Sequence, residues 1–175
     1  MLLDHGAGGK ISHHLTMDVM LPIFDNPILS AMNDGAIFEM AGKRFAFSTD
    51  TYTVDPIFFP GGSIGDLAIN GTVNDLAVTG ARPGYLGLNA VIEEGLELAL
   101  LDRILASLAR AASAAGVRVV AGDTKVVQRG QGGGLFLATT GIGVREPGIA
   151  LGLDRVRPGD RILVSGPVGD HGVAV

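Results

Sequence analysis

The chain of 175 residues contains no cysteine and no tryptophan, and aromatic residues make up only 5% of it. Without cysteine, the chain can form neither disulfides nor cysteine-based zinc sites, and it cannot use a thiol in catalysis. With so few aromatic residues, a core must be filled by leucine, valine, isoleucine and alanine. The hydrophobic content of 47% is sufficient for this, and the length fits one domain, or one domain and the start of another.

An excess of positive charge is also lacking, since the formal net charge is −5. Non-specific nucleic-acid binding rests on a basic surface, so a nucleic-acid partner is not expected. Long apolar runs are missing as well: no segment reaches the length of a transmembrane helix, and Met1–Lys10 does not have the form of a signal peptide. We therefore expect a soluble, cytoplasmic protein without a membrane partner.

Glycine, by contrast, is abundant at 27 residues, well above the usual level of roughly 7%. Several glycines precede an expected helix at Ile11–Leu21, which Pro22 should end. This N-terminal arm carries Gly6, Gly8, Gly9 and Lys10. Free backbone N–H groups and a lysine near a helix start favour phosphate binding, although the spacing is not that of a P-loop. The alternative interpretation is an ordinary flexible terminus.

The stretch Gly61–Pro83 predicts one amphipathic helix, capped by Ser63 and stopped by Gly80. Its expected apolar side consists of Ile64, Leu67, Ala68, Gly71, Val73 and Val78. Its polar stripe consists of Asp66, Asn70 and Asn74, four residues apart, with Asp75 beside the far end. Two interpretations stay open: a core helix with a solvated polar face, or a helix whose Asn74 and Asp75 face a metal or a nucleotide.

The other elements follow from apolar patterning. Strands are expected at residues 36–40, 44–49, 85–91, 117–121, 135–140 and 162–165. A second long helix is expected at Glu97–Ala115, with Gly116 after its last residue. Its apolar stripe should consist of Leu98, Leu101, Leu105, Leu108 and Ala112.

Four aspartates occupy comparable places in this pattern. Asp34 lies in a turn before a strand, Asp75 lies near the end of the first long helix, and Asp50 and Asp123 should follow apolar strands. Each alone is most simply a turn or cap residue. Together, and with Thr49, Thr124 and Asn74 as polar neighbours, they predict an oxygen-only Mg²⁺ site shared with substrate phosphates.

Lys125 follows Asp123 by two residues. It could neutralise a phosphate, or act as a base if it is desolvated. The residues therefore indicate a magnesium–nucleotide site built at strand ends, without a P-loop.

Five segments, in this order, carry a family resemblance: HGAGGK, FSTDTYTVDPIFFPGG, GTVNDLAVTGARP, EEG and AGDTKVVQRG. Together they resemble the HypE family of hydrogenase maturation factors. That family belongs with aminoimidazole ribonucleotide synthetase, selenophosphate synthetase and thiamine-monophosphate kinase. The resemblance implies an α+β N-terminal domain, a two-layer mixed sheet with helices on one face, which dimerises through its sheet. It also implies a C-terminal domain and an ATP cleft.

The resemblance implies a reaction and partners. ATP activates a carboxamide carried on a C-terminal cysteine, and its dehydration leaves a thiocyanate that supplies the cyanide ligand of [NiFe] hydrogenase. HypF loads the carboxamide, and a HypC–HypD scaffold receives the cyano group. Implied metal ligands are Asp34, Asp50 and Asp75; nucleotide contacts are Asn74, Asp123, Thr124 and the arm residues Gly6, Gly8, Gly9 and Lys10; catalytic residues are Lys125, which assists proton removal, and Asp75.

The sequence departs from this family in having no cysteine and in stopping at Val175. We therefore expect residues 1–35 to form the arm and first helix, 36–148 the ATP-binding α+β domain, and 149–175 the start of a truncated C-terminal domain. Alone, such a piece should not complete the dehydration. The alternatives are a non-catalytic dimerisation or scaffold domain, or another ATP-dependent enzyme of the superfamily such as thiamine-monophosphate kinase.

Overall fold

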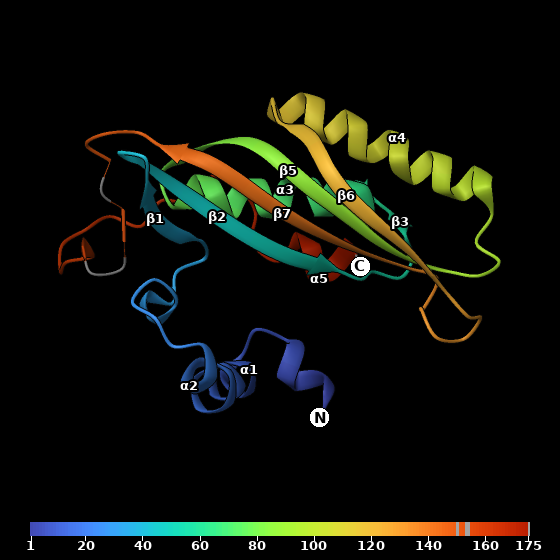
Figure 1. The fold of residues 1–175 in the computed structure, drawn as a ribbon, viewed down its shortest axis with the longest axis horizontal. Coiled ribbons are helices and arrows are strands. Elements are labelled where there is room, and N and C mark those ends of the chain that lie inside the picture. The colour runs from blue at the N-terminus through green and yellow to red at the C-terminus, as the bar shows by residue number, and fades with distance from the viewer. Residues whose placement is uncertain (150, 153–154, 175) are drawn as a thin grey trace.

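The computed structural model describes residues 1–149, 151–152 and 155–174, and it has a five-stranded sheet covered on one face by two long helices (Figure 1). The sheet strands are β1 (Ala36–Met40), β2 (Lys43–Tyr52), β5 (Ala81–Glu93), β6 (Arg118–Val127) and β7 (Leu135–Arg145), and the long helices are α3 (Ile64–Val78) and α4 (Leu98–Ala115). The shorter elements are η1 (Leu3–Gly6), α1 (Lys10–Leu15), η2 (Thr16–Met20), α2 (Leu21–Phe24), η3 (Leu29–Ala31), β3 (Phe58–Phe59), β4 (Gly62–Ser63) and α5 (Asp170–Ala174). In the described part of the chain, no helix is long and apolar enough to cross a membrane.

The strand order is β1-β2-β7-β5-β6, and only the β5–β6 pair is parallel. The β1–β2 hairpin turns at Ala41 and Gly42, whose φ values of 54° and 71° suit a tight hairpin. The parallel pair arises because α4 returns the chain over the sheet between β5 and β6. The α+β class, the mixed sheet and the placement of the helices on one face are thereby confirmed.

Helix α3 begins as its sequence predicts, since the Ser63 side chain accepts a hydrogen bond from the Asp66 N–H at 3.3 Å. Its buried residues are Ile64, Gly65, Ala68, Ile69, Thr72 and Leu76. The expected apolar side was partly wrong, because Val78 is 55% exposed. Small and hydroxyl-bearing residues face inward instead, since the helix approaches both the sheet and α4 closely.

Helix α4 ends at Gly116, whose φ of +68° makes it a left-handed cap. Its buried residues are Ile104, Ser107, Leu108, Ala111 and Ala112. The expected stripe was partly wrong, because Leu98 is 78% and Leu105 47% exposed. The contact face is centred on small residues because α4 lies close to α3: a Cβ on Gly65 would overlap Oγ of Ser107.

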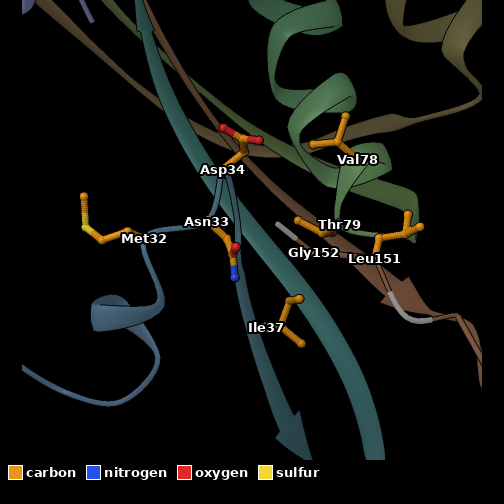
Figure 2. Close-up of a pocket in the computed structure, with 8 residues that line it drawn as sticks. All are labelled: Met32, Asn33, Asp34, Ile37, Val78, Thr79, Leu151 and Gly152. Carbon is orange, nitrogen blue, oxygen red and sulfur yellow. The ribbon is translucent and has the colours of Figure 1, made fainter. Parts of the chain in front are cut away.

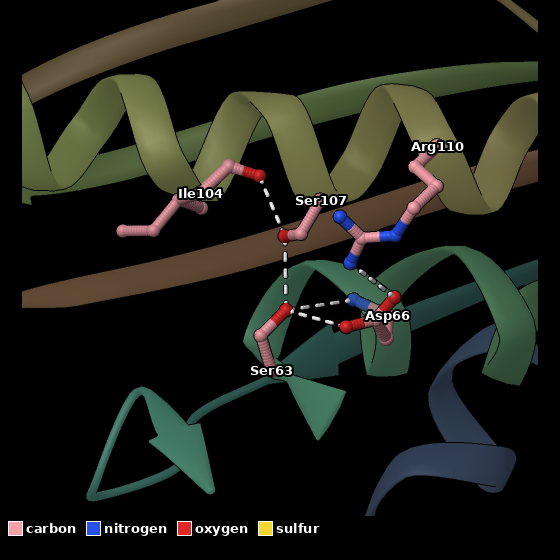
Figure 3. A network of polar contacts seen from close by, with 5 residues as sticks. All are labelled: Ser63, Asp66, Ile104, Ser107 and Arg110. Atoms are coloured by element: carbon pink, nitrogen blue, oxygen red, sulfur yellow. Dashed lines mark hydrogen bonds and ion pairs between the residues drawn. The ribbon is translucent and has the colours of Figure 1, made fainter. Parts of the chain in front are cut away.

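A small polar network joins the two helices at this close approach (Figure 3). The Ser63 hydroxyl lies 2.9 Å from Oγ of Ser107, which donates to the Ile104 carbonyl at 2.8 Å. Arg110 reaches Asp66 at 3.3 Å on the solvent side. The core below this network lies between the helices and one sheet face, and it includes Ile69, Leu86 and Leu137.

Two expected boundaries are corrected. Strand β6 runs on through Asp123 and Lys125 because it pairs with β5 as far as Glu93. The N-terminal helical run passes Pro22 and ends at Phe24, since proline is tolerated in the first turn of α2.

The strand expected at 162–165 is not formed. In the described part of the chain, Ile162 and Leu163 have no strand to pair with and are 93% and 90% exposed. Residues 150, 153–154 and 175 of the expected segment 149–175 lie outside the described residues.

Candidate functional site

Asp34, Asp50 and Asp75 lie where the turn before β1, strand β2 and helix α3 adjoin, close enough for the charges of Asp34 and Asp50 to act on Asp75. Figure 2 shows Asp34 beside the C-terminal end of α3, near Val78 and Thr79. Asp34, Val78 and Thr79 line a hollow of about 280 Å³ with Met32, Asn33, Ile37, Leu151 and Gly152. The turn fits tightly here, because a Cβ on Gly35 would lie 3.1 Å from Cγ2 of Thr79.

Ser48 organises this cluster from inside. It is 4% exposed, and its Oγ lies 2.9 Å from Oδ2 of Asp75 and 3.3 Å from the Asp34 carbonyl oxygen. Its single hydroxyl hydrogen therefore bonds to a group from α3 or to one from the turn. Each of these bonds ties strand β2 to one of the two segments that carry the other carboxylates.

The pKa of the Asp75 carboxyl is raised, first by burial. The hydrogen bond from Ser48 lowers it, but the negative charges of Asp50 and Asp34 raise it further. A cation near Asp75 would offset the repulsion that the charges of Asp34 and Asp50 exert on its carboxylate.

Asp50 is the outer end of a polar chain that runs into the core. The Tyr52 hydroxyl donates to Oδ2 of Asp50 at 2.9 Å and lies 3.3 Å from Oγ1 of Thr72. Thr72 bonds to Thr139, which donates to the Ala68 carbonyl at 3.0 Å. Burial of the phenol is the main cause that raises the pKa of Tyr52 to about 12.

Gly71 explains why a glycine occurs in the middle of α3. A Cβ there would overlap the Tyr52 hydroxyl and lie 2.9 Å from the Tyr52 ring. The glycine thus admits Tyr52 against the helix and lets its hydroxyl reach Asp50.

The donor set fits Mg²⁺ in chemistry, because carboxylate and hydroxyl oxygens are the ligands that this ion prefers. Among the described residues, no three Asp, Glu or His side chains converge closely enough to hold an ion by themselves. Magnesium is usually bound by one or two carboxylates together with water and substrate phosphates. The cluster therefore suits an ion that arrives with a polyphosphate.

The polar stripe of α3 is confirmed as one face. Asp66, Asn70 and Asn74 line a groove of about 310 Å³ together with Tyr52, Phe59, Gly61, Gly62, Leu67 and Gly71. Asp66 accepts hydrogen bonds from Ser63 at 2.7 Å and from Arg110 at 3.3 Å. Asn74 is exposed, and it remains available to a ligand.

Asp123 and Lys125 lie on the opposite face of the sheet from Asp50. They pair with Asn89 and Val91, which alternate with the core-packed Leu88 and Ala90. The open face here is hollowed by about 430 Å³, lined in part by Asn89, Asp123 and Thr140. Lys125 Nζ lies 3.6 Å from Oδ2 of Asp123.

The site expected at strand ends was therefore wrong in its geometry. Asp50 lies within β2 and Asp123 within β6, because both strands run past their apolar stretches. Thr124 pairs with Ala90, which places it on the helix-covered side at the sheet edge. Thr49 precedes Asp50 in β2, but its side chain does not lie beside that of Asp50 as expected. It faces the open side of the sheet, where its Oγ1 lies 3.1 Å from Oγ1 of Thr140.

The N-terminal arm makes local contacts. Gly8 has a φ of +72° and donates its N–H to Oγ of Ser12 at 3.0 Å, and Gly9 precedes α1 as its cap. A Cβ on Gly6, Gly8 or Gly9 would meet no atom within 4 Å. Lys10 is the exposed first residue of α1, and the arm lies apart from β2 and α3, the elements that carry Asp50 and Asp75 (Figure 1).

The sequence interpretation missed the hydroxyl residues that contact the carboxylates or extend their hydrogen-bonded chain into the core. These are Ser48, Tyr52, Thr72 and Thr139. The alternation of Ala46, Ser48, Asp50 and Tyr52 along β2 was an available signal, because alternate residues of a strand share a face.

Comparison with known proteins places this chain in a family. Residues 32–145 match the model of the AIR synthase related protein, N-terminal domain. The chain belongs to this family.

Among its relatives, carbamoyl dehydratase HypE of Azotobacter vinelandii is 50% identical over 171 residues, 98% of this chain and 50% of that protein. A structure of HypE in complex with ATP is 54% identical, with a TM-score of 0.73 over 99% of this chain and 51% of that chain. A chain of the HypE–HypF complex is 46% identical, with a TM-score of 0.85 over 91% of this chain and 52% of that chain. The resemblance to HypE is thus confirmed, and the chain spans about half the length of these relatives.

Proposed function

We propose that this chain is the nucleotide-binding half of an ATP-dependent carbamoyl dehydratase of the HypE type. The reaction converts a cysteine S-carboxamide and ATP into a thiocyanate, ADP, inorganic phosphate and a proton. The carboxamide oxygen leaves in the phosphate, and the carboxamide nitrogen loses both of its hydrogens. The product supplies the cyanide ligand for [NiFe] hydrogenase maturation.

The observation that carries the proposal is the placement of Asp34 and Asp50 close enough to Asp75 for their charges to act on it, with Ser48 lying 2.9 Å from the Asp75 carboxylate and 3.3 Å from the Asp34 carbonyl oxygen. It occurs in a chain 54% identical to a HypE protein whose structure contains ATP. The three aspartates would hold Mg²⁺ at this place. When bound, the ion would neutralise the phosphate charge that develops as the leaving group departs.

The other residues have roles that their chemistry allows. The N–H groups of Gly6, Gly8 and Gly9, with the Lys10 ammonium, bind phosphate oxygens when the arm closes. Asn74, Asp123 and Thr124 orient the nucleotide. Lys125 accepts a proton from the carboxamide nitrogen, with Asp123 at 3.6 Å holding its amine in place.

A homodimer through the open face of the sheet is part of the proposal. That face presents apolar side chains to solvent, among them Phe47 at 39% exposure and Tyr85 and Val144 at 44% each. Exposed apolar surface of this kind is typical of association surfaces.

The remaining partners follow from the same assignment. The reacting cysteine is not among the 175 residues, so the substrate carboxamide, HypF and the HypC–HypD scaffold would meet this half together with a C-terminal half. We propose that residues 1–35 act as the arm, 36–148 as the ATP-binding domain and 149–175 as the start of the next domain.

Calorimetric titration of the chain with ATP, with and without Mg²⁺, tests the proposal. We expect magnesium-dependent binding that Asp75→Asn abolishes. If the chain alone binds nothing, it should be fused to the C-terminal half of the Azotobacter vinelandii relative and assayed for ATP turnover. Absence of both binding and turnover would refute the assignment.

A further inference from the structure

The side chain of Glu93, at the end of β5, holds the loop that joins β6 to β7. Its Oε1 accepts the backbone N–H of Gly130 at 2.8 Å, and its Oε2 accepts those of Gly132 at 3.1 Å and Gly134 at 3.2 Å. These three bonds are the leading causes of a lowered pKa of Glu93. The carboxylate is therefore charged near neutral pH, and the bonds are charge-assisted.

The loop is shaped to receive this carboxylate. Gly130 and Gly134 have φ values of +85° and +88°, which favour glycine. A Cβ on Gly132 would lie 2.8 Å from Cγ2 of Val127. The three glycines thus turn alternate N–H groups toward one anion, and the Glu93 N–H closes the ring by donating to the Gly134 carbonyl at 2.9 Å.

Strand β6, which leads into this loop, has few other side-chain contacts to fix its position, although Gly122 fits so closely against β5 that a Cβ there would overlap the Leu88 carbonyl oxygen. It ends the sheet order, and it pairs with β5 alone among the described strands. All of its residues from Arg118 to Val126 are exposed, so burial of side chains does not select its register. A slip by one residue would turn Asp123 and Lys125 to the other face of the sheet.

The two ends of the β5–β6 pair carry the contacts that can fix the register. At the first end, Arg118 donates to the Tyr85 hydroxyl at 2.9 Å, but a register shift follows at Leu86. At the second end, Glu93 holds the loop and Glu94 N–H donates to the Val127 carbonyl at 2.8 Å. The stretch with Asp123 and Lys125 lies on the Glu93 side of the shift.

We propose that Glu93 is a positioning residue for Asp123 and Lys125. By closing the glycine-rich loop 128–134 onto the end of β5, it fixes the register at which β6 presents these two side chains on the open face. Glu93 acts through the backbone of β6 and not on reacting atoms. The inference rests on the proposed function in giving this register a role at the nucleotide site, but the register itself can be measured without nucleotide.

Amide hydrogen exchange of the 175-residue chain, followed by mass spectrometry, tests the register. Glu93→Gln removes the charge that holds the loop, and Glu94→Gln removes the same charge from the exposed neighbouring side chain. We expect Glu93→Gln to speed exchange of residues 118–134 by about tenfold or more, with α3 and α4 unchanged. Glu94→Gln should match the unaltered chain, and Glu93→Asp, which keeps the charge on a shorter stem, should restore part of the protection.

Titration of the same variants with Mg²⁺–ATP tests the role at the site. We expect weaker binding for Glu93→Gln and unchanged binding for Glu94→Gln. Faster exchange confined to residues 128–134 would overturn the proposal, because Glu93 would then hold the loop and not β6. Faster exchange of β6 with unchanged nucleotide affinity would overturn it too. Failure of the unaltered chain to bind counts against the proposed function, and the exchange comparison then decides the role of Glu93 in the register.

Discussion

Tyr52 donates its hydroxyl hydrogen to Oδ2 of Asp50 at 2.9 Å, from two residues further along the same strand. Both side chains point to the helix-covered face, because alternate residues of a strand share a side. The same hydroxyl lies 3.3 Å from Oγ1 of Thr72, which is fully buried in α3. A carboxylate of the candidate site is therefore anchored to the core.

Tyr52→Phe should lower the free energy of unfolding by about 1 to 2 kcal/mol, because the Thr72 and Asp50 oxygens lose a partner. Urea denaturation measures this. The matched control is Tyr85→Phe, whose hydroxyl bonds to Arg118 at the surface and should cost less than about 0.5 kcal/mol. Equal costs for the two variants would show that the Asp50 anchor adds nothing to stability.

Gly71→Ala should destabilise the chain by about 1 to 3 kcal/mol, because the new methyl group meets Tyr52. Helix propensity alone predicts a gain of about 1 kcal/mol, so the two explanations differ in sign. In a Tyr52→Phe background the cost should shrink, since the nearest atom, the hydroxyl oxygen, is gone. A double-mutant cycle on thermal unfolding measures this coupling.

Asp75→Asn should abolish magnesium-dependent nucleotide binding and leave the chain at least as stable at pH 7. The pKa of Asp75 is raised in the folded chain, so the unaltered chain loses stability as pH rises from below the ordinary aspartate pKa through the raised one. The asparagine variant lacks this loss, and its amide oxygen still accepts from Ser48. Unfolding followed by circular dichroism between pH 3 and 7 checks the slope; an unfolded variant would make Asp75 structural.

Lys125→Met should change the free energy of unfolding by less than about 0.5 kcal/mol, because the exposed pair with Asp123 contributes little. In the fusion with a C-terminal half, the same change should lower kcat for ATP-dependent dehydration by about 100-fold or more. The KM for ATP should stay nearly constant if Lys125 serves as a base. A raised KM with unchanged kcat would instead give it a role in phosphate binding.

The loop 128–134 should respond to acid through Glu93. The pKa of this carboxyl is lowered in the folded chain, so its contribution is present above the ordinary glutamate pKa and is lost as pH falls through the lowered value. The amide proton shifts of Gly130, Gly132 and Gly134 should titrate together with a midpoint below the ordinary glutamate pKa. Nuclear magnetic resonance measures them, and the midpoint should vanish in Glu93→Gln and persist in Glu94→Gln.

The sequence predicted the fold class because both long helices and the β1–β2 hairpin carry local signals. Ser63 and Gly116 cap where expected, since caps depend on residues within one turn. The buried faces were less predictable: the contact at Gly65 and Ser107 is set by how closely two helices approach, which no periodicity within either helix contains.

The arrangement of the candidate site could not be predicted from the sequence. Asp34 and Asp50 lie close enough to Asp75 for their charges to act on it, but Asp123 lies across the sheet from them. Asp123 lies on that face because β6 extends through it and alternate residues of a strand share a face. The length of β6 depends in turn on its pairing with β5. Apolar patterning could not show that pairing, because β6 continues through glycine and charged residues.

Strand β6 also leaves one edge of the sheet without a strand partner among the described residues. Val120 and Val126 on it are 61% and 68% exposed, and such an edge can add strands from other chains and aggregate. Asp123 and Lys125 interrupt these valines with charge, which is how gatekeeper residues protect open edges. Neutral substitutions made to probe chemistry at these positions therefore also remove protection, so loss of activity should be read only from samples shown to be monodisperse.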